Sequence, residues 1–369
     1  MRAFVTGGAG FIGSHLVDAL LARGDQVTVY DRLSTGSTQF LEGPLGLSAD
    51  PKNPRLSLVR GDILDIEMLQ TSMKGHDIVF HLAANADVRG GTVHRRLDYE
   101  QNVVGTQNLL DGMQVNGVRA LIFVSSAVVY GEPSVFPTPE SYKGTQTSLY
   151  GASKLAAEAA IEAYAHYDGI RTQVIRLVSL VGERYTHGVV FDFVRKLRDN
   201  PHELEILGDG RQCKSYLYVL DAVRAMLLAE ENGHRSESGR VEAYNVGSNE
   251  TLEAKLVADI VCDELGLDHV QYRYAGGKRG WPGDSPRVVL DTRKIEALGW
   301  RPTVSPEEGI RRTVRYLRDH PALLDRPAAR RMEAVTERST AKAKVDSHAA
   351  APPVGFMQPM KDTLAGRER

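Results

Sequence analysis

Short apolar runs alternate with longer stretches of helical periodicity along the first half of the chain. Runs rich in Val, Ile and Leu predict buried strands, and apolar positions three and four apart predict amphipathic helices. A repeated strand–helix–strand order with short connections predicts an α/β fold, a doubly wound parallel sheet with right-handed crossovers. The predicted strands are RAFVTG, QVTVYD, LSLVRGD, DIVFHLAA, ALIFVSS and TQVIRLVS, and the clearest helices span residues 11–24, 98–115 and 149–167.

The regular alternation fades after residue 180, which predicts a second, smaller α/β domain. A later apolar helix and the run EAYNVG return to the first pattern, so the first domain is predicted at 1–178 and 214–247. The smaller domain is assigned to 179–213 and 248–320. The remaining segment, 321–369, is polar, charged and rich in Ala and Pro, which is typical of a disordered tail.

Composition narrows the function classes. The chain has 369 residues and a formal net charge of only −2, and this balance argues against a nucleic-acid binder. Two cysteines, Cys213 and Cys262, support neither a disulfide framework nor a cysteine zinc site. No apolar run reaches membrane-spanning length, and the N-terminus lacks the pattern of a signal peptide. We therefore expect a cytoplasmic protein without a membrane or nucleic-acid partner, and without a metal.

The stretch VTGGAGFIGSHL predicts a dinucleotide site. It places Gly8, Gly10 and Gly13 in a G-x-G-x-x-G spacing between the first strand and its helix, and Gly7 adds a second register. Glycine is needed because the turn is tight and the backbone must approach a pyrophosphate, which the helix N-terminus then binds. The cofactor-binding residues predicted in this turn are Gly7, Gly10, Phe11, Ile12 and Gly13.

The end of the second strand indicates which dinucleotide binds. Asp31 lies about 20 residues after the glycines, where an acid holds the ribose hydroxyls. A carboxylate there repels a 2′-phosphate, so NAD is favoured over NADP. Arg32 follows immediately and keeps NADP open as an alternative.

Tyr150 and Lys154 lie four positions apart in SLYGASKLAAEA, on one face of a predicted helix. A lysine near a phenol favours the phenolate, so we expect Lys154 to lower the pKa of Tyr150 toward the range of a general base. The alternative is an ordinary surface pair. Ser126 ends a predicted strand at its carboxyl end, where ligands bind in parallel sheets, although a serine there is also typical of a helix cap.

Six motifs occur in an order that resembles a known family. They are TGGAGFIG, GDI at 61–63, HLAA at 81–84, NVVGT at 102–106, SSAVVYG and YGASK. Over residues 1 to about 318 the chain resembles the extended short-chain dehydrogenase/reductases, within them the NAD-dependent nucleotide-sugar epimerase/dehydratases. The resemblance implies a catalytic group of Ser126, Tyr150 and Lys154, and a homodimer built from two helices of each subunit. It also implies that Asn102 holds the active-site helix. The cofactor-binding residues that it adds are Asp62, Ile63, Leu82, Ala83, Ala84, Asn102, Ser125, Tyr150 and Lys154.

The same resemblance implies a reaction. Tyr150 would remove the 4-hydroxyl proton of a sugar while C4 gives hydride to NAD, and return of hydride to the other face would invert C4. Related dehydratases carry an Asp-Glu pair just after the catalytic hydroxyl residue, where this chain has Ala127 and Val128. The same positions count less strongly against a decarboxylase. We therefore expect a 4-epimerase; the alternatives are a UDP-glucuronate decarboxylase or 4-ketosugar reductase, and a non-catalytic NAD-binding protein.

The expected substrate is a UDP-sugar, with UDP-glucose and UDP-glucuronate as comparable candidates. Arg89, in HLAANADVR, would meet a C6 carboxylate, although such a basic loop is as often surface decoration. Trp281 occupies the place of a family arginine, so Arg279 or Arg287 would have to form a diphosphate clamp with Lys214; the alternative is that these cations are simply solvated. The remaining substrate-binding residues implied by the resemblance are Ser126, Ser179, Arg184, Thr186, His187, Lys214, Arg279 and Arg287.

Overall fold

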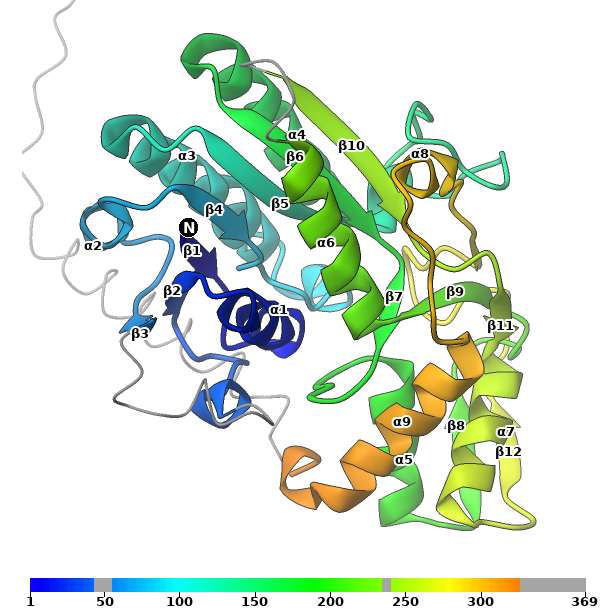
Figure 1. Ribbon diagram of the computed structural model, residues 1–369. Coiled ribbons are helices and arrows are strands. Elements are labelled where there is room, and N and C mark those ends of the chain that lie inside the picture. The colour runs from blue at the N-terminus through cyan, green and yellow to red at the C-terminus, as the bar shows by residue number, and fades with distance from the viewer. Residues whose placement is uncertain (43–54, 234–239, 326–369) are drawn as a thin grey trace, which may run out of the picture. The chain divides into compact units, whose positions relative to one another are not determined.

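The computed structural model describes residues 1–42, 55–233 and 240–325. Within these residues, seven parallel strands form one sheet in the order β10-β6-β5-β4-β1-β2-β3 (Figure 1). The order reverses beside β1, as in a doubly wound sheet, so the predicted fold class is confirmed. The strands are β1 (Arg2–Thr6), β2 (Gln26–Asp31), β3 (Leu56–Arg60), β4 (Ile78–His81), β5 (Ala120–Ser126), β6 (Arg171–Leu177) and β10 (Val241–Val246).

Helices cover both faces of this sheet. Apolar side chains of α2 (Ile66–Met73), α3 (Gly105–Asn116) and α4 (Leu149–Asp168) share one buried cluster with one face of the strands. Those of α1 (Phe11–Ala22) and α6 (Val219–Gly233) belong to the cluster on the other face. Both faces of the central strands are therefore buried, which explains why these strands are continuous runs of apolar residues.

Two local predictions need correction. LSLVRGD was expected to be a buried strand, but β3 lies at the edge of the sheet and the Leu58 side chain is 41% exposed. The helix expected at 98–115 begins instead as a π-helical turn, η3 (Tyr99–Val104), before α3 continues it. A π-helical turn is wider than an α-helical turn, so it changes which side chains face the sheet. A pattern of apolar residues with a period of 3.6 residues does not predict such a turn.

A smaller set of elements follows β6. Strands β11 (Thr251–Glu253), β9 (Cys213–Tyr218) and β13 (Arg287–Val288) pair in that order, and β7 (Ser179–Val181) also pairs with β9. Residues 214–218, which the predicted boundary gives to the first domain, thus lie in this small sheet. The other elements are β8 (Glu203–Ile206), β12 (Gln271–Tyr274), α5 (Val189–Asp199), α7 (Ala254–Leu265), α8 (Arg293–Glu296), α9 (Pro306–Asp319), and the short turns η1 (Thr38–Leu41), η2 (Gly90–Thr92), η4 (Ala127–Tyr130) and η5 (Pro321–Leu323).

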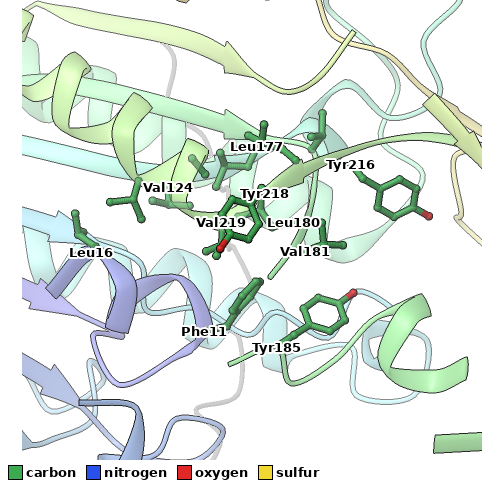
Figure 2. Close-up of a cluster of buried hydrophobic side chains, with 14 of the residues drawn as sticks. Phe11, Leu16, Val124, Leu177, Leu180, Val181, Tyr185, Tyr216, Tyr218 and Val219 are labelled. Carbon is green, nitrogen blue, oxygen red and sulfur yellow. The ribbon is translucent and has the colours of Figure 1, made fainter. Parts of the chain in front are cut away.

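A buried apolar cluster joins the two parts (Figure 2). Phe11, the first residue of α1, packs edge-on against Tyr185, with ring centroids 5.3 Å apart. Leu323 and Leu324 are also buried, so residues 321–325 of the predicted tail pack on the fold, and the rest of that tail lies outside the described residues. In the described ranges every helix is too short or too polar to cross a lipid bilayer.

Candidate active site

The glycine turn after β1 packs against the end of β4. Gly7 has φ +71°, and a Cβ there would lie 2.7 Å from the Ala83 nitrogen. A Cβ on Gly13 would lie 2.2 Å from the Gly7 carbonyl oxygen. Both positions therefore require glycine, the first for its left-handed conformation and the second so that α1 can sit on the turn. A Cβ on Gly10 would meet only the Gly7 oxygen, at 3.1 Å.

The start of α1 fits the pyrophosphate of NAD. Gly10 is the N-cap, and no side chain of the residues that the structure describes caps the helix. The N–H groups of Phe11, Ile12 and Gly13 belong to the first turn, which has no intrahelical acceptor, so they are available to an anion. The positive end of the helix dipole adds to this preference for negative charge.

Asp31 fits the ribose of the same cofactor. Its carboxylate accepts hydrogen bonds from the Ala9 nitrogen at 3.0 Å and the Leu33 nitrogen at 2.7 Å. Burial raises the pKa of Asp31, and these two bonds oppose the shift. The Arg32 guanidinium bonds to Ser34 and reaches Asp62 at 3.4 Å. Arg32 is thus directed to Ser34 and Asp62. The Asp31 carboxylate remains as the group that fits the two ribose hydroxyls of NAD.

The other residues predicted to bind the cofactor surround this turn. Leu82 and Ala83 donate to the main chain and hydroxyl of Thr6, and Ala84 follows them at the end of β4. Ile63 is buried, and its Cδ1 atom would lie 2.4 Å from a Cβ on Gly105. The buried Ser125 hydroxyl donates to Glu158, and its predicted contact with the cofactor stays a prediction.

Ser126 and Tyr150 come together at the carboxyl edge of the sheet. Ser126 ends β5, and its hydroxyl accepts from the Val128 nitrogen at 3.3 Å, so it also caps η4. Tyr150 is the second residue of α4, whose start is capped by Ser148. Burial, together with the charge of Asp98, raises the pKa of Tyr150 to about 12, and the Ser126 hydroxyl acts in the opposite direction.

Lys154 does not act on Tyr150 as predicted. Its ammonium donates to the Val124 carbonyl oxygen at 2.9 Å and lies 4.8 Å from the centre of the Phe123 ring. Burial lowers the pKa of Lys154 to about 8, against the effect of Glu158. The expectation that Lys154 lowers the pKa of Tyr150 is therefore wrong for this structure, because the ammonium is directed to the main chain of β5.

Asn102 contacts α4, the helix that carries Tyr150 and Lys154. Its Nδ2 donates to the Ser153 hydroxyl at 2.9 Å, one residue before Lys154. Its Oδ1 accepts from the Asn85 nitrogen at 2.8 Å. One buried amide thus joins η3, α4 and the loop after β4.

Two acids in this region were missed by the sequence argument. Asp98 is buried; its Oδ1 accepts from the Asn85 side chain at 2.8 Å, and Oδ2 has no partner among the described residues. Glu158 accepts from Ser125 and forms a buried ion pair with Arg176 at 2.6 Å. Both lie four residues from a predicted site residue, Asp98 before Asn102 and Glu158 after Lys154, and this helical spacing was the available signal.

The three cations of the predicted diphosphate clamp are all engaged. Lys214 pairs with the buried Asp284 at 2.5 Å. Arg279 donates to the Asp284 carbonyl oxygen at 2.7 Å and pairs with Glu132 at 2.5 Å. Arg287 lies over the Phe136 ring, 4.5 Å from its centre. Pairing of β9 with β13 brings the first and last of these together, and Asp284, which sequence reasoning missed, connects Lys214 to Arg279.

The residues predicted to surround the sugar have different partners and exposures in the structure. Arg89 pairs with Asp192 at 3.0 Å, and the buried Arg184 pairs with Asp18 of α1 at 2.8 Å. Each guanidinium thus has an acid from a distant segment as its partner, while Arg184 Nη1 has no hydrogen-bond partner among the described residues. The Thr186 hydroxyl lies 3.2 Å from His187 Nδ1, and Ser179 is exposed in β7 opposite Tyr216.

A cavity of about 310 Å³ borders the start of α4. Its walls come from η2 and its flanks, from residues 147–149, and from residues 281–283. The Thr147 hydroxyl donates to the Gly283 carbonyl oxygen at 3.2 Å, which joins two of these walls. In the described part of the chain, no three His, Cys, Asp or Glu side chains are grouped to hold a metal ion.

Comparison with known proteins identifies the class. The NAD dependent epimerase/dehydratase family matches residues 3–247, and the chain belongs to this family, which is NAD-dependent. A putative UDP-glucose 4-epimerase of Methanocaldococcus jannaschii is 32% identical over 322 residues, 86% of this chain and 98% of the relative. A solved UDP-galactose 4-epimerase superposes with a TM-score of 0.77 and 39% identity, over 87% of this chain and 99% of that one.

A Thermus thermophilus UDP-glucose 4-epimerase in complex with NAD superposes with a TM-score of 0.75 and 35% identity, over 86% of this chain and 99% of that one. Other reactions are also represented. A dTDP-glucose 4,6-dehydratase of Streptomyces griseus is 31% identical over 86% of this chain and 94% of the relative. UDP-glucuronic acid decarboxylase 1 of Arabidopsis thaliana is 31% identical over 86% of this chain and 70% of the relative. Family membership therefore leaves the reaction and the sugar open.

Proposed function

We propose that this protein is an NAD-dependent 4-epimerase of a UDP-sugar, either UDP-glucose/UDP-galactose or UDP-glucuronate/UDP-galacturonate. The observation that carries the proposal is the hydroxyl pair at the carboxyl edge of the sheet. Ser126 ends β5 beside the buried Tyr150, whose pKa it lowers, and the two residues after Ser126 are Ala127 and Val128. In this proposal Tyr150 is the base for one hydroxyl, and the two positions after Ser126 supply neither an acid nor a base for a second step.

The chain's own residues divide the work. NAD, when bound, supplies a reversible hydride acceptor. Tyr150 takes the proton of the sugar 4-hydroxyl and later returns it, while Ser126 hydrogen-bonds the same oxygen and keeps it beside the phenol. Lys154, whose ammonium donates to the Val124 carbonyl oxygen, belongs to the cofactor-binding part of the site in this proposal. Burial of this group keeps water from the reacting oxygen.

The two alternative reactions on this scaffold have less support. A dehydratase needs an acid and a base to remove the 6-hydroxyl, and neither Ala127 nor Val128 can transfer a proton. A decarboxylase remains the second candidate because one is among the relatives; it would release carbon dioxide from UDP-glucuronate. A ketosugar reductase would consume reduced cofactor. A purely NAD-binding role is disfavoured because Ser126, Tyr150 and Lys154 are all present.

Other parts of the proposal concern the ligand, assembly and location. Lys214 and Arg279, held around Asp284, are the cations proposed to bind the diphosphate, joined by Arg287. A homodimer through α3 and α4 is supported by exposed apolar side chains on these helices, Val115 and Leu155. Cys213 and Cys262 are both free thiols, which fits a cytoplasmic location.

Proton NMR of UDP-glucose and UDP-glucuronate, each incubated with the purified protein and NAD, tests the proposal. Appearance of the galacto isomer from either sugar supports 4-epimerisation. Conversion of neither sugar, or release of carbon dioxide, contradicts it. Tyr150→Phe should abolish turnover and still bind NAD, because the phenol oxygen is removed without changing the glycine turn.

A further inference from the structure

The cavity beside α4 has an unusual wall. Among the described residues that line it, Arg95 is the only charged one, and no carboxylate faces it. Trp281 supplies an aromatic side chain, and Thr92, Thr147 and Ser148 supply hydroxyls. An aromatic face with several hydroxyl groups is suited to a sugar ring, which has both C–H and O–H groups. The single cation adds a preference for a negative substituent.

Arg95 is available for such a substituent. It is exposed, and within the part of the chain that the structure describes it has no hydrogen-bond or ion-pair partner. Arg89 and Arg184, the cations expected near the sugar, are instead paired with Asp192 and Asp18. Arg96, the next residue, lies near Glu100 at 3.6 Å and is not part of the cavity wall. The charge that an anionic sugar needs is therefore present at Arg95.

The cavity is also close to the reacting group. Ser148 and Leu149 line it and directly precede Tyr150 in the chain. Gly91, which also lines the cavity, has the Leu149 Cβ atom 3.4 Å from the position of an added Cβ and the Asp98 Oδ2 atom 2.6 Å from it. A buried acid thus lies behind this wall, so an anion in the cavity needs the nearby cation.

We propose that Arg95 is a specificity-determining residue, which binds the C6 carboxylate of a hexuronate and so makes a UDP-uronate the preferred substrate. Trp281 covers the sugar ring on the opposite side of the same cavity. The inference rests on the proposed 4-epimerase function and adds the identity of the C6 group. A guanidinium binds a carboxylate through two parallel hydrogen bonds, which a neutral C6 hydroxyl cannot match.

Kinetics of Arg95→Gln with both sugars tests the inference. The variant should lower kcat/KM for UDP-glucuronate by about 10- to 100-fold, the range for a lost charged hydrogen bond, and that for UDP-glucose by less than about threefold. Arg96→Gln is the matched control and should change neither, since Arg96 lies outside the cavity. Trp281→Leu should lower kcat/KM for both sugars. Equal effects of Arg95→Gln on the two sugars, or no effect on either, would overturn the role of Arg95.

Binding separates this inference from the proposed reaction. Isothermal titration of the NAD-loaded protein with UDP-glucuronate and with UDP-glucose needs no turnover. If wild-type protein converts neither sugar, the 4-epimerase proposal fails. A selective loss of UDP-glucuronate affinity in Arg95→Gln still supports the carboxylate site in that case. Unchanged affinity for UDP-glucuronate in this exposed-residue variant overturns it.

Discussion

The side-chain amide of Asn102 donates to the Ser153 hydroxyl at 2.9 Å, and this bond ties the π-helical turn to α4 between Tyr150 and Lys154. The same side chain accepts from the Asn85 nitrogen. One buried side chain therefore contacts both α4, which carries Tyr150 and Lys154, and the loop after β4. A change at Asn102 acts on both without touching either reacting side chain.

Asn102→Ala should lower stability and turnover together. The change removes a buried amide and leaves the partly buried Asn85 nitrogen without its acceptor, which costs about 1–3 kcal/mol. Urea unfolding measures this loss, and kcat should fall while NAD affinity changes little. Ser153→Ala is the paired control: because the two residues share one bond, the double variant should lose less than the sum of the single variants. Additive losses would show that the bond does not couple them.

Asp98→Asn should shift the pH dependence of turnover to lower pH. The charge of Asp98 is one of the groups that raise the pKa of Tyr150, after burial, while Ser126 lowers it. Removing the charge lowers the pKa of Tyr150, so the phenolate is present at lower pH and the acidic limb of kcat moves down.

The matched control for Asp98→Asn is Glu100→Gln, which neutralises a partly exposed acid two residues away. This control should leave the acidic limb in place. The hydrogen bond from the Asn85 side chain can persist in Asp98→Asn, so the fold is expected to be kept. Coincident pH profiles for wild type and Asp98→Asn would show that Asp98 serves only the structure.

His81 should make the protein less stable in mild acid. Its ring is buried between the Thr6 and Thr106 hydroxyls, and burial, with the charge of Lys154, lowers the pKa of His81 to about 3. Below the ordinary value of 6.5 the unfolded chain takes up a proton that the folded chain does not. Stability is therefore full above about pH 6.5 and falls by up to about 1.4 kcal/mol per pH unit as pH drops toward 3.

Urea unfolding across this pH range measures the effect. His81→Gln should have a flatter dependence on pH than wild type, although it is less stable near neutral pH. His15 and His76 also have lowered pKa values and contribute to both proteins, so the difference isolates His81. The exposed His320→Gln should follow the wild-type curve; parallel curves for His81→Gln and wild type would contradict the prediction.

Gly13→Ala should weaken NAD binding and stability. The added methyl group would lie 2.2 Å from the Gly7 carbonyl oxygen, so α1 must shift away from the turn, at a cost of about 1–3 kcal/mol. Calorimetric titration with NAD measures the first effect and urea unfolding the second. Gly112→Ala is the control inside another helix, where the neighbouring atom is the flexible end of Met73 at 3.3 Å. Equal tolerance of both changes would refute the packing argument.

Features that depend on neighbouring residues could be predicted from the sequence. The glycine turn, the acid at the end of β2 and the shared helix carrying Tyr150 and Lys154 all follow from spacing within one or two elements. The direction of the Lys154 ammonium could not be predicted, because its acceptor, Val124, belongs to another element. The same reason hid the pairs of Arg89 with Asp192 and of Arg184 with Asp18, in which the partners are far apart in sequence.

Burial could be predicted for the central strands and not for β3. An apolar run predicts a hydrophobic environment, but only the strand order shows which run lies at an edge. The cavity wall formed by Arg95 and Trp281 is a further case, because three distant segments meet there. The exposure of β3 and the composition of the cavity wall depend on packing between segments that are distant in sequence. A single sequence does not show which of its segments pack together.

The pairing of β10 with β6 has a consequence for synthesis on the ribosome. The six strands β1 to β6 of the large sheet are translated before residue 178. Strand β10, which pairs with the outer edge of β6, is translated only after residues 178–240. During that interval a nascent chain carries an open strand edge with unpaired N–H and C=O groups, a template for pairing with another chain. We therefore expect polysomes making this protein to depend on a holding chaperone during that interval, and a chain stopped before Val241 to aggregate.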